Sequence, residues 1–307
     1  MLAVDDTIPL PAALDDTQPL ENENESHTTD VPSVLEAFNI SVKIFQVLDE
    51  ARNMNGEAIN KSFGLSELAE TLQLNEKLDA IERNLPAHLK PNKSMSEDTP
   101  RARMFKLQAE SVMLRILNVR SILLRPPVLA AARMSFSSPS ATETVSSAET
   151  TLRHTVSALS VATAVSAISM LHDNLQSPYR IMSSSVVFMV LSAATLIIAA
   201  SLVPEFEVSI EPSTKYRDTI TMAFEVLEGH QWQIENARGA RKQLESFIDI
   251  VKQTAKHRIR GASAMPASHD DASLAPNPFE HSDVDLNDPL WNVQWFDTSF
   301  WPLPPVP

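Results

Sequence analysis

Two pairs of adjacent carboxylates are the nearest approach to a catalytic arrangement in this sequence. Asp15–Asp16 and Asp270–Asp271 have the residue type that general acid–base catalysis uses. Both pairs lie in acidic stretches, where solvated charge explains them better than a catalytic dyad. The 307 residues include no cysteine, no glycine-rich phosphate loop, no Gly-x-Ser-x-Gly and no His-Glu-x-x-His, and the eight histidines lack ligand spacing. We therefore expect no catalytic residues, no cofactor and no metal, and we do not expect an enzyme.

The carboxyl-terminal segment carries the side chains best suited to contacts with other proteins. From Asp283 onwards, acids are interleaved with aromatic residues, including three of the four tryptophans. Acidic residues keep such a segment open in solvent, so its aromatic side chains can enter a hydrophobic groove of a partner. The alternative is that these aromatic side chains dock on the chain's own helical body. The predicted partner-binding residues are Trp291, Trp295, Phe296, Phe300 and Trp301.

The charge distribution separates two acidic ends from a nearly neutral middle. The net charge is −14, yet residues 1–36 hold nine acids and residues 264–307 hold seven, and neither stretch contains Lys or Arg. Setting these 16 of the 39 acids aside leaves 23 acids against 25 basic residues, a net charge of +2 for the middle. Such a body lacks a broad basic surface for phosphate backbones, so we expect no direct DNA binding by this chain.

Composition and periodicity predict an all-α protein. Five glycines are too few for the turns of a many-stranded β protein, whereas connections between helices need fewer. Capping boxes at Ser33–Glu36 and Ser146–Glu149 mark two helix starts, and Thr99-Pro100 marks a third. Apolar residues at helical spacing predict helices from Ser33, at about 66–85, at 99–124, at 146–175, over 181–204, after Pro212, and at 234–259.

Prolines and composition set the expected boundaries. Arg125-Pro126-Pro127 is expected to end the helix that starts at Thr99, because proline cannot donate to the helical ladder. A serine-rich loop is expected from Ser135 to Ser147. We therefore expect an acidic, proline-rich lead-in at 1–32, an irregular multi-helix body at 33–261, and an acidic-aromatic tail at 262–307, with both ends largely disordered.

One uncharged segment has two interpretations. Residues 181–204 lack any charge, and Val186–Val203 is apolar enough and long enough to span a membrane. Interspersed Ser and Thr, a missing basic flank and the acids that follow at Glu205 and Glu207 favour a buried core helix. The alternative is a membrane-associated protein anchored by 181–204, paired with the segment 155–171.

The order of several segments resembles a known family. These segments are Asp6-Thr-Ile-Pro-Leu-Pro11 with Asp15–Asp16, Leu78–Leu89 ending in Asn-Leu-Pro-Ala-His-Leu, the leucine-rich Leu114–Leu129 with its Arg-Pro motif, the apolar Pro178–Pro204, and Ala223–Leu244. Taken in order over residues 4–258, they resemble the regulatory (middle homology) region of fungal zinc-cluster transcription factors. The resemblance implies a helical regulatory body in which Arg125, Pro126 and Pro127 form a structural motif.

The resemblance also implies a function. It implies a nuclear regulator that contacts the transcription machinery or co-regulator proteins through the acidic-aromatic tail, with a small-molecule effector and oligomerisation as further expectations. The family's six-cysteine zinc cluster has no counterpart here, so the chain corresponds to the later part of such a regulator. Apolar faces are therefore expected to be left exposed, chiefly on 100–124 and 181–203. The alternatives are a protein of the cytoplasm or an intracellular membrane, or a truncated, inactive remnant.

Overall fold

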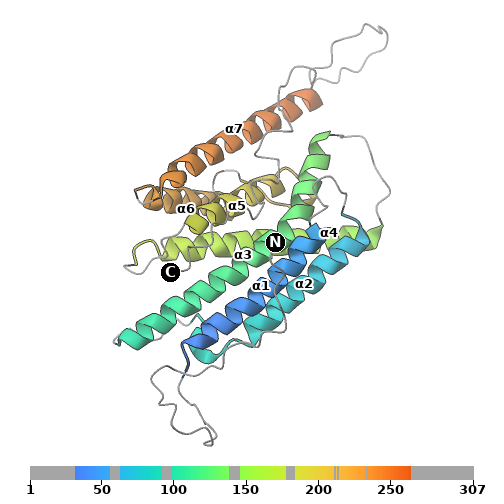
Figure 1. Ribbon diagram of the computed structural model, residues 1–307. Coiled ribbons are helices and arrows are strands. Elements are labelled where there is room, and N and C mark those ends of the chain that lie inside the picture. Colours follow the sequence, from blue (N-terminus) through green and yellow to red (C-terminus); the bar gives the residue numbers. More distant parts are fainter. Residues whose placement is uncertain are drawn as a thin grey trace, which may run out of the picture.

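The computed structural model describes residues 32–55, 63–91, 99–137, 146–177, 184–210, 212, 214–232 and 234–263. Within these ranges it contains seven α-helices, two short 3-10 helices and no strand (Figure 1), which confirms the all-α class. The helices are α1 (Leu35–Asn55), α2 (Leu65–Arg83), α3 (Pro100–Ser137), α4 (Ser147–Asp173), α5 (Ser184–Ala200), α6 (Lys215–His230) and α7 (Glu235–Ser263), with η2 (Ala87–Leu89) and η3 (Pro204–Phe206) between them.

Side-chain caps begin four of the helices, and one of them is α3, where Thr99 Oγ1 accepts a hydrogen bond from the backbone nitrogen of Ala102 at 3.1 Å. Ser33 Oγ accepts a hydrogen bond from the backbone nitrogen of Leu35 at 3.2 Å, and Ser146 Oγ accepts from that of Glu149 at 3.2 Å. Thr214 Oγ1 accepts from the backbone nitrogen of Arg217 at 3.2 Å. Each cap satisfies a donor that has no partner inside the helix. The predicted starts of α1, α3 and α4 are therefore confirmed.

The prediction that α3 ends at Arg125 is wrong. The helix continues through Pro126 and Pro127 to Ser137, and Figure 1 shows that its last turns rise in a new direction. The two prolines cannot donate to carbonyls four residues earlier, which kinks a helix without always ending it. Buried residues on both sides of the kink, Leu124 and Val128, provide the packing that maintains the helix.

Two hydrophobic cores share α3. The first half of α3 packs with α1, α2 and η2 around Ile44, Leu78 and Ile116. The larger core joins α3 to α4, α5, α6 and α7. Helix α4 contacts α2, α3, α5 and α6, so it lies between the two sets of helices (Figure 1). Small side chains such as Ser160, Ala164 and Ala167 are buried along α4 and allow this close packing.

Helix α5 occupies the centre of the larger core. Its residues from Ala193 to Ala200 are all buried, and none is more than 8% exposed. Helices α3, α4, α6 and α7 surround it. Among the described residues, α4 is the helix that is long and apolar enough to cross a membrane by length and composition alone, and half of its apolar window is buried inside the protein. Membrane association by 181–204 stays a prediction.

The exposed apolar side chains lie elsewhere than the sequence suggested. The expectation of exposed faces on 100–124 and 181–203 is wrong for the described residues, because α3 serves both cores and α5 is enclosed on several sides. Within the described ranges, the large hydrophobic residues that are exposed are Phe38, Phe45, Leu65, Met134 and Trp232. Of these, Met134 lies beyond the kink of α3, beside the pocket described next.

Candidate functional site

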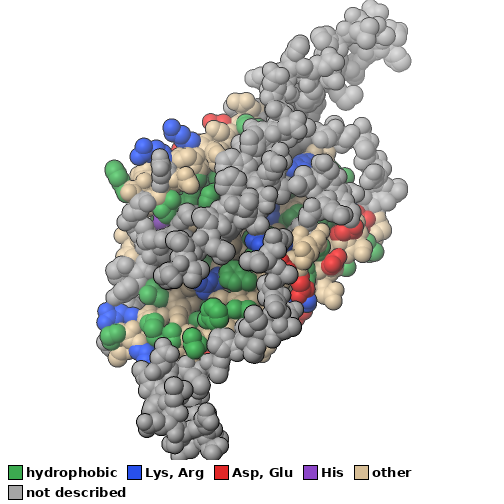
Figure 2. All heavy atoms as spheres, viewed as in Figure 1, with side chains coloured by type: hydrophobic (Ala, Val, Ile, Leu, Met, Phe, Trp, Pro, Cys, Tyr) green, Lys and Arg blue, Asp and Glu red, His purple; other side chains and the backbone are tan. Residues whose placement is uncertain are grey.

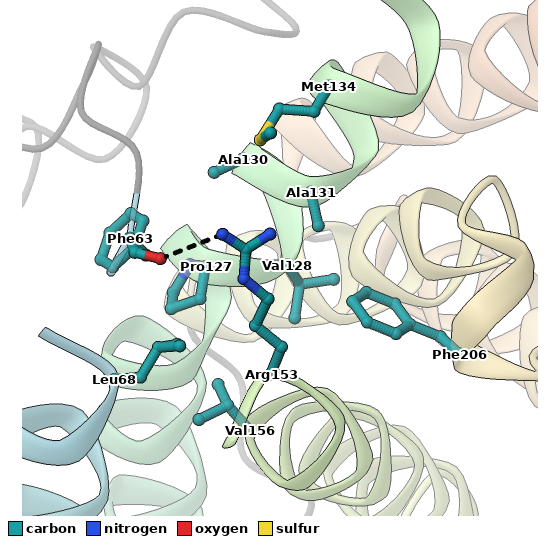
Figure 3. Close-up of a pocket in the computed structure, with 10 residues that line it drawn as sticks. All are labelled: Phe63, Leu68, Pro127, Val128, Ala130, Ala131, Met134, Arg153, Val156 and Phe206. Carbon is teal, nitrogen blue, oxygen red and sulfur yellow. Dashed lines mark hydrogen bonds between the residues drawn. The ribbon is translucent and has the colours of Figure 1, made fainter. Parts of the chain in front are cut away.

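A pocket opens where four parts of the fold meet. It lies between the entry to α2, the part of α3 beyond the kink, the first turns of α4, and η3 (Figure 3). The enclosed part is small: the centre of a water-sized molecule has about 10 Å³ available, roughly enough for one water, and the rest of the surrounding space of about 320 Å³ includes open solvent. Nine apolar residues and one arginine line it: Phe63, Leu68, Pro127, Val128, Ala130, Ala131, Met134, Arg153, Val156 and Phe206.

The kink in α3 creates one wall of this pocket. Pro127, Ala131 and Met134 follow one another at i, i+4 and i+7, so they share a face of the helix beyond the kink. Pro127 is itself buried, Ala131 is partly buried, and Met134 is 44% exposed at the end of the wall. A straight α3 would carry this face away from α2 and η3, so the two prolines position the wall.

The opposite side of the pocket joins two small hydrophobic clusters. Phe63, Leu68 and Val156 belong to a cluster that connects α2 to α4. Phe206 packs on a second cluster that contains Ala132 of α3 and the end of α5. The pocket therefore lies at the junction between the two halves of the helical body.

Arg153 is the single charged residue of the lining. Its Nη2 donates to Glu149 Oε1 at 2.6 Å, one turn earlier on α4, and to the backbone oxygen of Phe63 at 3.4 Å (Figure 3). Its side chain is 25% exposed, yet its Nε is buried and has no hydrogen-bond partner. The guanidinium therefore has a carboxylate partner, and its Nε is enclosed by protein atoms.

Arg125 links the start of the kink to α5. Its guanidinium is buried and donates to Ser192 Oγ at 3.1 Å and to Thr195 Oγ1 at 3.4 Å. Burial lowers the pKa of Arg125 to about 9, so the side chain is still charged at pH 7. Arg125 thus connects α3 to the core helix immediately before Pro126 and Pro127. The three residues of the motif lie together at the bend, and Pro127 also lines the pocket.

The chain has no match among known proteins in three comparisons, with protein-family models, with curated proteins and with solved structures. The likeness to fungal zinc-cluster regulators therefore depends on the sequence motifs alone. The pocket must accordingly be interpreted from its own chemistry.

Metal binding has little support within the described ranges. No group of three or more His, Asp or Glu residues there could hold a metal ion. The residue pairs first considered for catalysis, Asp15–Asp16 and Asp270–Asp271, lie outside the described residues. The residues predicted to bind a partner also lie outside them: Trp291, Trp295, Phe296, Phe300 and Trp301.

Sequence reasoning did not single out Arg153 or Phe63. The spacing of Glu149 and Arg153, four residues apart at the start of a predicted helix, indicates an ion pair. That spacing gives no sign that Nε of Arg153 is buried. The residues that line the pocket together with Arg153 include Phe63 and residues in the bent part of α3. These two elements are distant from α4 in the sequence.

Proposed function

We propose that this chain is a transcription regulator that resembles the regulatory domain of fungal zinc-cluster factors and acts through contacts with proteins or a small effector. It performs no catalysis and has no DNA-binding module of its own. The observation that carries the proposal is the pocket beside the Arg125-Pro126-Pro127 bend, with nine apolar residues and one arginine in its lining. Such a lining suits recognition of a ligand, whereas acid–base catalysis needs converging titratable groups.

The position of the family-like motif supports this proposal. Arg125, Pro126 and Pro127 set the direction of the last turns of α3, and those turns form a wall of the pocket. A contact made in the pocket would therefore act on the orientation of a helix segment that belongs to both halves of the body. A regulatory domain requires a coupling of this kind between a binding site and a movable element.

The charge of the body supports the absence of DNA binding. The central region has a net charge of only +2, and the acids concentrate at the two ends. On the face seen in Figure 2, Lys and Arg side chains form small separate groups, interrupted by hydrophobic and neutral side chains. Electrostatic binding to a duplex depends on several phosphate contacts along one surface. We therefore propose that these 307 residues make no direct contact with duplex DNA.

The burial of α5 favours this regulator over the membrane-anchored alternative. A helix that anchors a protein in lipid presents an apolar surface to its surroundings, whereas α5 places its residues 193–200 inside the body. The proposed site of action is the nucleus, where the acidic-aromatic tail would contact the transcription machinery or co-regulators.

A tethered reporter assay tests the proposal. The full chain is fused to an unrelated DNA-binding domain, and we expect reporter expression to change several-fold relative to that domain alone. The matched control, Asp283→Asn, should keep the change, because one acid contributes little to the solvation of the tail. Replacing Trp291, Trp295, Phe296 and Trp301 by Ala should abolish it. Unchanged expression from an intact fusion in the nucleus would contradict the proposal.

A further inference from the structure

We infer that one face of α1, where aromatic side chains are exposed beside basic ones, is the docking surface for the acidic-aromatic tail of the same chain. This aromatic-basic face is formed by Phe38, Val42, Phe45 and Arg52 of α1 and by Arg115 of α3. The tail segment concerned is residues 283–301. The inference goes beyond the proposed function and does not depend on it.

Exposed apolar side chains define the centre of this face. Phe38 and Phe45 are 54% and 47% exposed, although the opposite side of their helix is buried against α2 and α3. Val42 lies between them on the same face and is only partly buried. Single exposed apolar side chains are ordinary, whereas adjacent ones on one face mark a site of contact.

The side chain of Arg115 on α3 lies beside the two phenylalanines. Its Nη1 donates to Ser41 Oγ on α1 at 2.9 Å. Ser41 comes three residues after Phe38 and four before Phe45, so it occupies the same side of α1 as both rings. The guanidinium of Arg115 therefore borders the apolar centre of the face.

The two arginines of the face lack carboxylate partners. Within the described ranges, neither Arg52 nor Arg115 forms an ion pair with Asp or Glu. Burial lowers the pKa of Arg52, an effect that nearby Asp49 partly offsets, and burial also lowers the pKa of Arg115. Two positive groups against one negative group favour an acidic segment as the occupant.

The surroundings of the face have a similar composition. In the lower half of the view in Figure 2, hydrophobic and basic side chains are mixed over α1 and the first half of α3, whereas acidic side chains lie along the right edge. Glu36 and Glu50 of α1 are engaged on another side of the helix, with His88 of η2 and with Lys77 of α2. The phenylalanines thus have a mainly basic border.

The tail has the complementary chemistry. Residues 264–307 hold seven acids and no Lys or Arg, and the segment 283–301 holds five aromatic side chains. Aromatic rings pair with other rings and lie over guanidinium groups, while the acids match the basic border. Residues 1–31 are acidic as well, but they contain no aromatic residue and offer less to the two phenylalanines.

The tail is long enough to reach α1. Its 44 residues from 264 to 307 extend to at most about 150 Å, whereas the 21 residues of α1 measure about 32 Å. Attachment to the same chain raises the effective concentration of the tail to roughly the millimolar range, so that even a weak contact is populated. A docked tail and a tail bound to another protein would exclude each other.

A spin label on α1 tests the docking in the full-length chain. The protein has no cysteine, so Asn53→Cys, at an exposed position of α1, gives a single labelling site. NMR follows the indole N–H signals of Trp291, Trp295 and Trp301. We expect the label to broaden these signals and its reduction to restore them. A control label at Ala158→Cys, exposed on α4, should leave them sharp.

Variants and salt separate the parts of the contact. Phe38→Ala combined with Phe45→Ala should release the tail and remove most of the broadening by the label at position 53. Leu65→Ala is the matched control, because Leu65 is 47% exposed on α2, outside the face, and it should keep the broadening. Raising the ionic strength from about 0.1 M to about 1 M shortens the Debye length from about 10 Å to about 3 Å and should weaken the broadening.

Several results would overturn the inference. They are sharp tail indole signals in the chain labelled at position 53, equal broadening after replacement of both phenylalanines, or broadening that does not change with salt. Broadening of residues 1–31 beside sharp tail signals would assign the face to the lead-in. Equal broadening between separate spin-labelled and isotope-labelled chains would assign it to a second copy.

The first of these measurements leaves the face unchanged, so a folding defect cannot obscure it. Docking in a chain that fails the reporter assay would reject the proposed function and keep the docking surface. Reporter activity in a chain with sharp tail signals would reject the docking alone.

Discussion

Replacing Arg120 by methionine should weaken the contact between α2 and α3 and lower the stability of the fold. Nε of Arg120 donates to Asn75 Oδ1 at 3.1 Å, and its Nη2 donates to Asp79 Oδ1 at 2.5 Å and to Glu82 Oε2 at 2.9 Å. Only 12% of the Arg120 side chain is exposed, against 33% for Asp79 and 36% for Glu82. One side chain on α3 therefore holds three polar groups on α2.

The loss can be worked out contact by contact. The hydrogen bond to the neutral amide of Asn75 contributes about 1 kcal/mol. Each carboxylate contact would contribute about 1.5–3 kcal/mol if buried, but about a third of each carboxylate side chain is in solvent, which reduces it to about 0.5–1 kcal/mol. Methionine retains most of the apolar stem, so cavity formation adds little. The total is a decrease of about 2–3 kcal/mol in the free energy of unfolding.

Urea unfolding followed by circular dichroism measures this decrease. With a slope of about 2–3 kcal/mol per molar urea, the midpoint should fall by roughly 1 M. Arg83→Met is the matched control on the neighbouring helix, because the Arg83–Glu76 pair is 62% and 64% exposed and should leave the midpoint unchanged. Two results would contradict this prediction. They are equal urea midpoints for the two variants, or a lowered slope of the unfolding free energy against urea concentration for Arg120→Met alone.

Three further predictions concern pH, the buried arginine and the apolar helix. Burial lowers the pKa of His88, an effect that nearby Glu36 partly offsets, so stability should be constant above about pH 6.5 and fall as pH drops through that value toward the lower folded pKa. His88→Gln should reduce this fall in urea midpoints measured at several pH values, and parallel curves for both proteins would contradict it. Arg125→Lys should be less stable than Arg125→Met, because lysine leaves a buried charge with fewer donors, and thermal melts of both variants decide the order. The chain should be released from cell membranes by carbonate, since residues 193–200 are buried in the body, and carbonate-resistant sedimentation would support the anchor instead.

Local signals predicted most of the helices, and the tertiary contacts account for the exceptions. Ser146 caps α4 as its capping-box pattern indicates, because a cap needs only residues within one turn. The end of α3 was predicted wrongly, because the cost of two internal prolines is local while the packing that offsets it comes from other helices. Whether proline ends or bends a helix is thus decided outside the helix.

The candidate site was less predictable than the fold. The Arg125-Pro126-Pro127 motif was recognised as structural, but its part in shaping a pocket depends on η3 and on Phe63, which are distant in sequence. The burial of Arg153 Nε is likewise a property of the folded chain and not of the local spacing. Periodicity identifies which face of a helix is buried, whereas it does not identify which polar atom within that face is left without a partner.

We propose that the pocket at the bend of α3 controls the output of this chain as a transcription regulator. Reporter expression from the tethered full-length chain, compared between Ala131→Phe and Ala158→Phe at equal protein levels, tests it most directly. Ala131 lines the pocket, whereas Ala158 is exposed on α4. We expect Ala131→Phe to change expression several-fold and Ala158→Phe to match the unchanged chain. Identical expression from both variants, with both proteins folded, would contradict it.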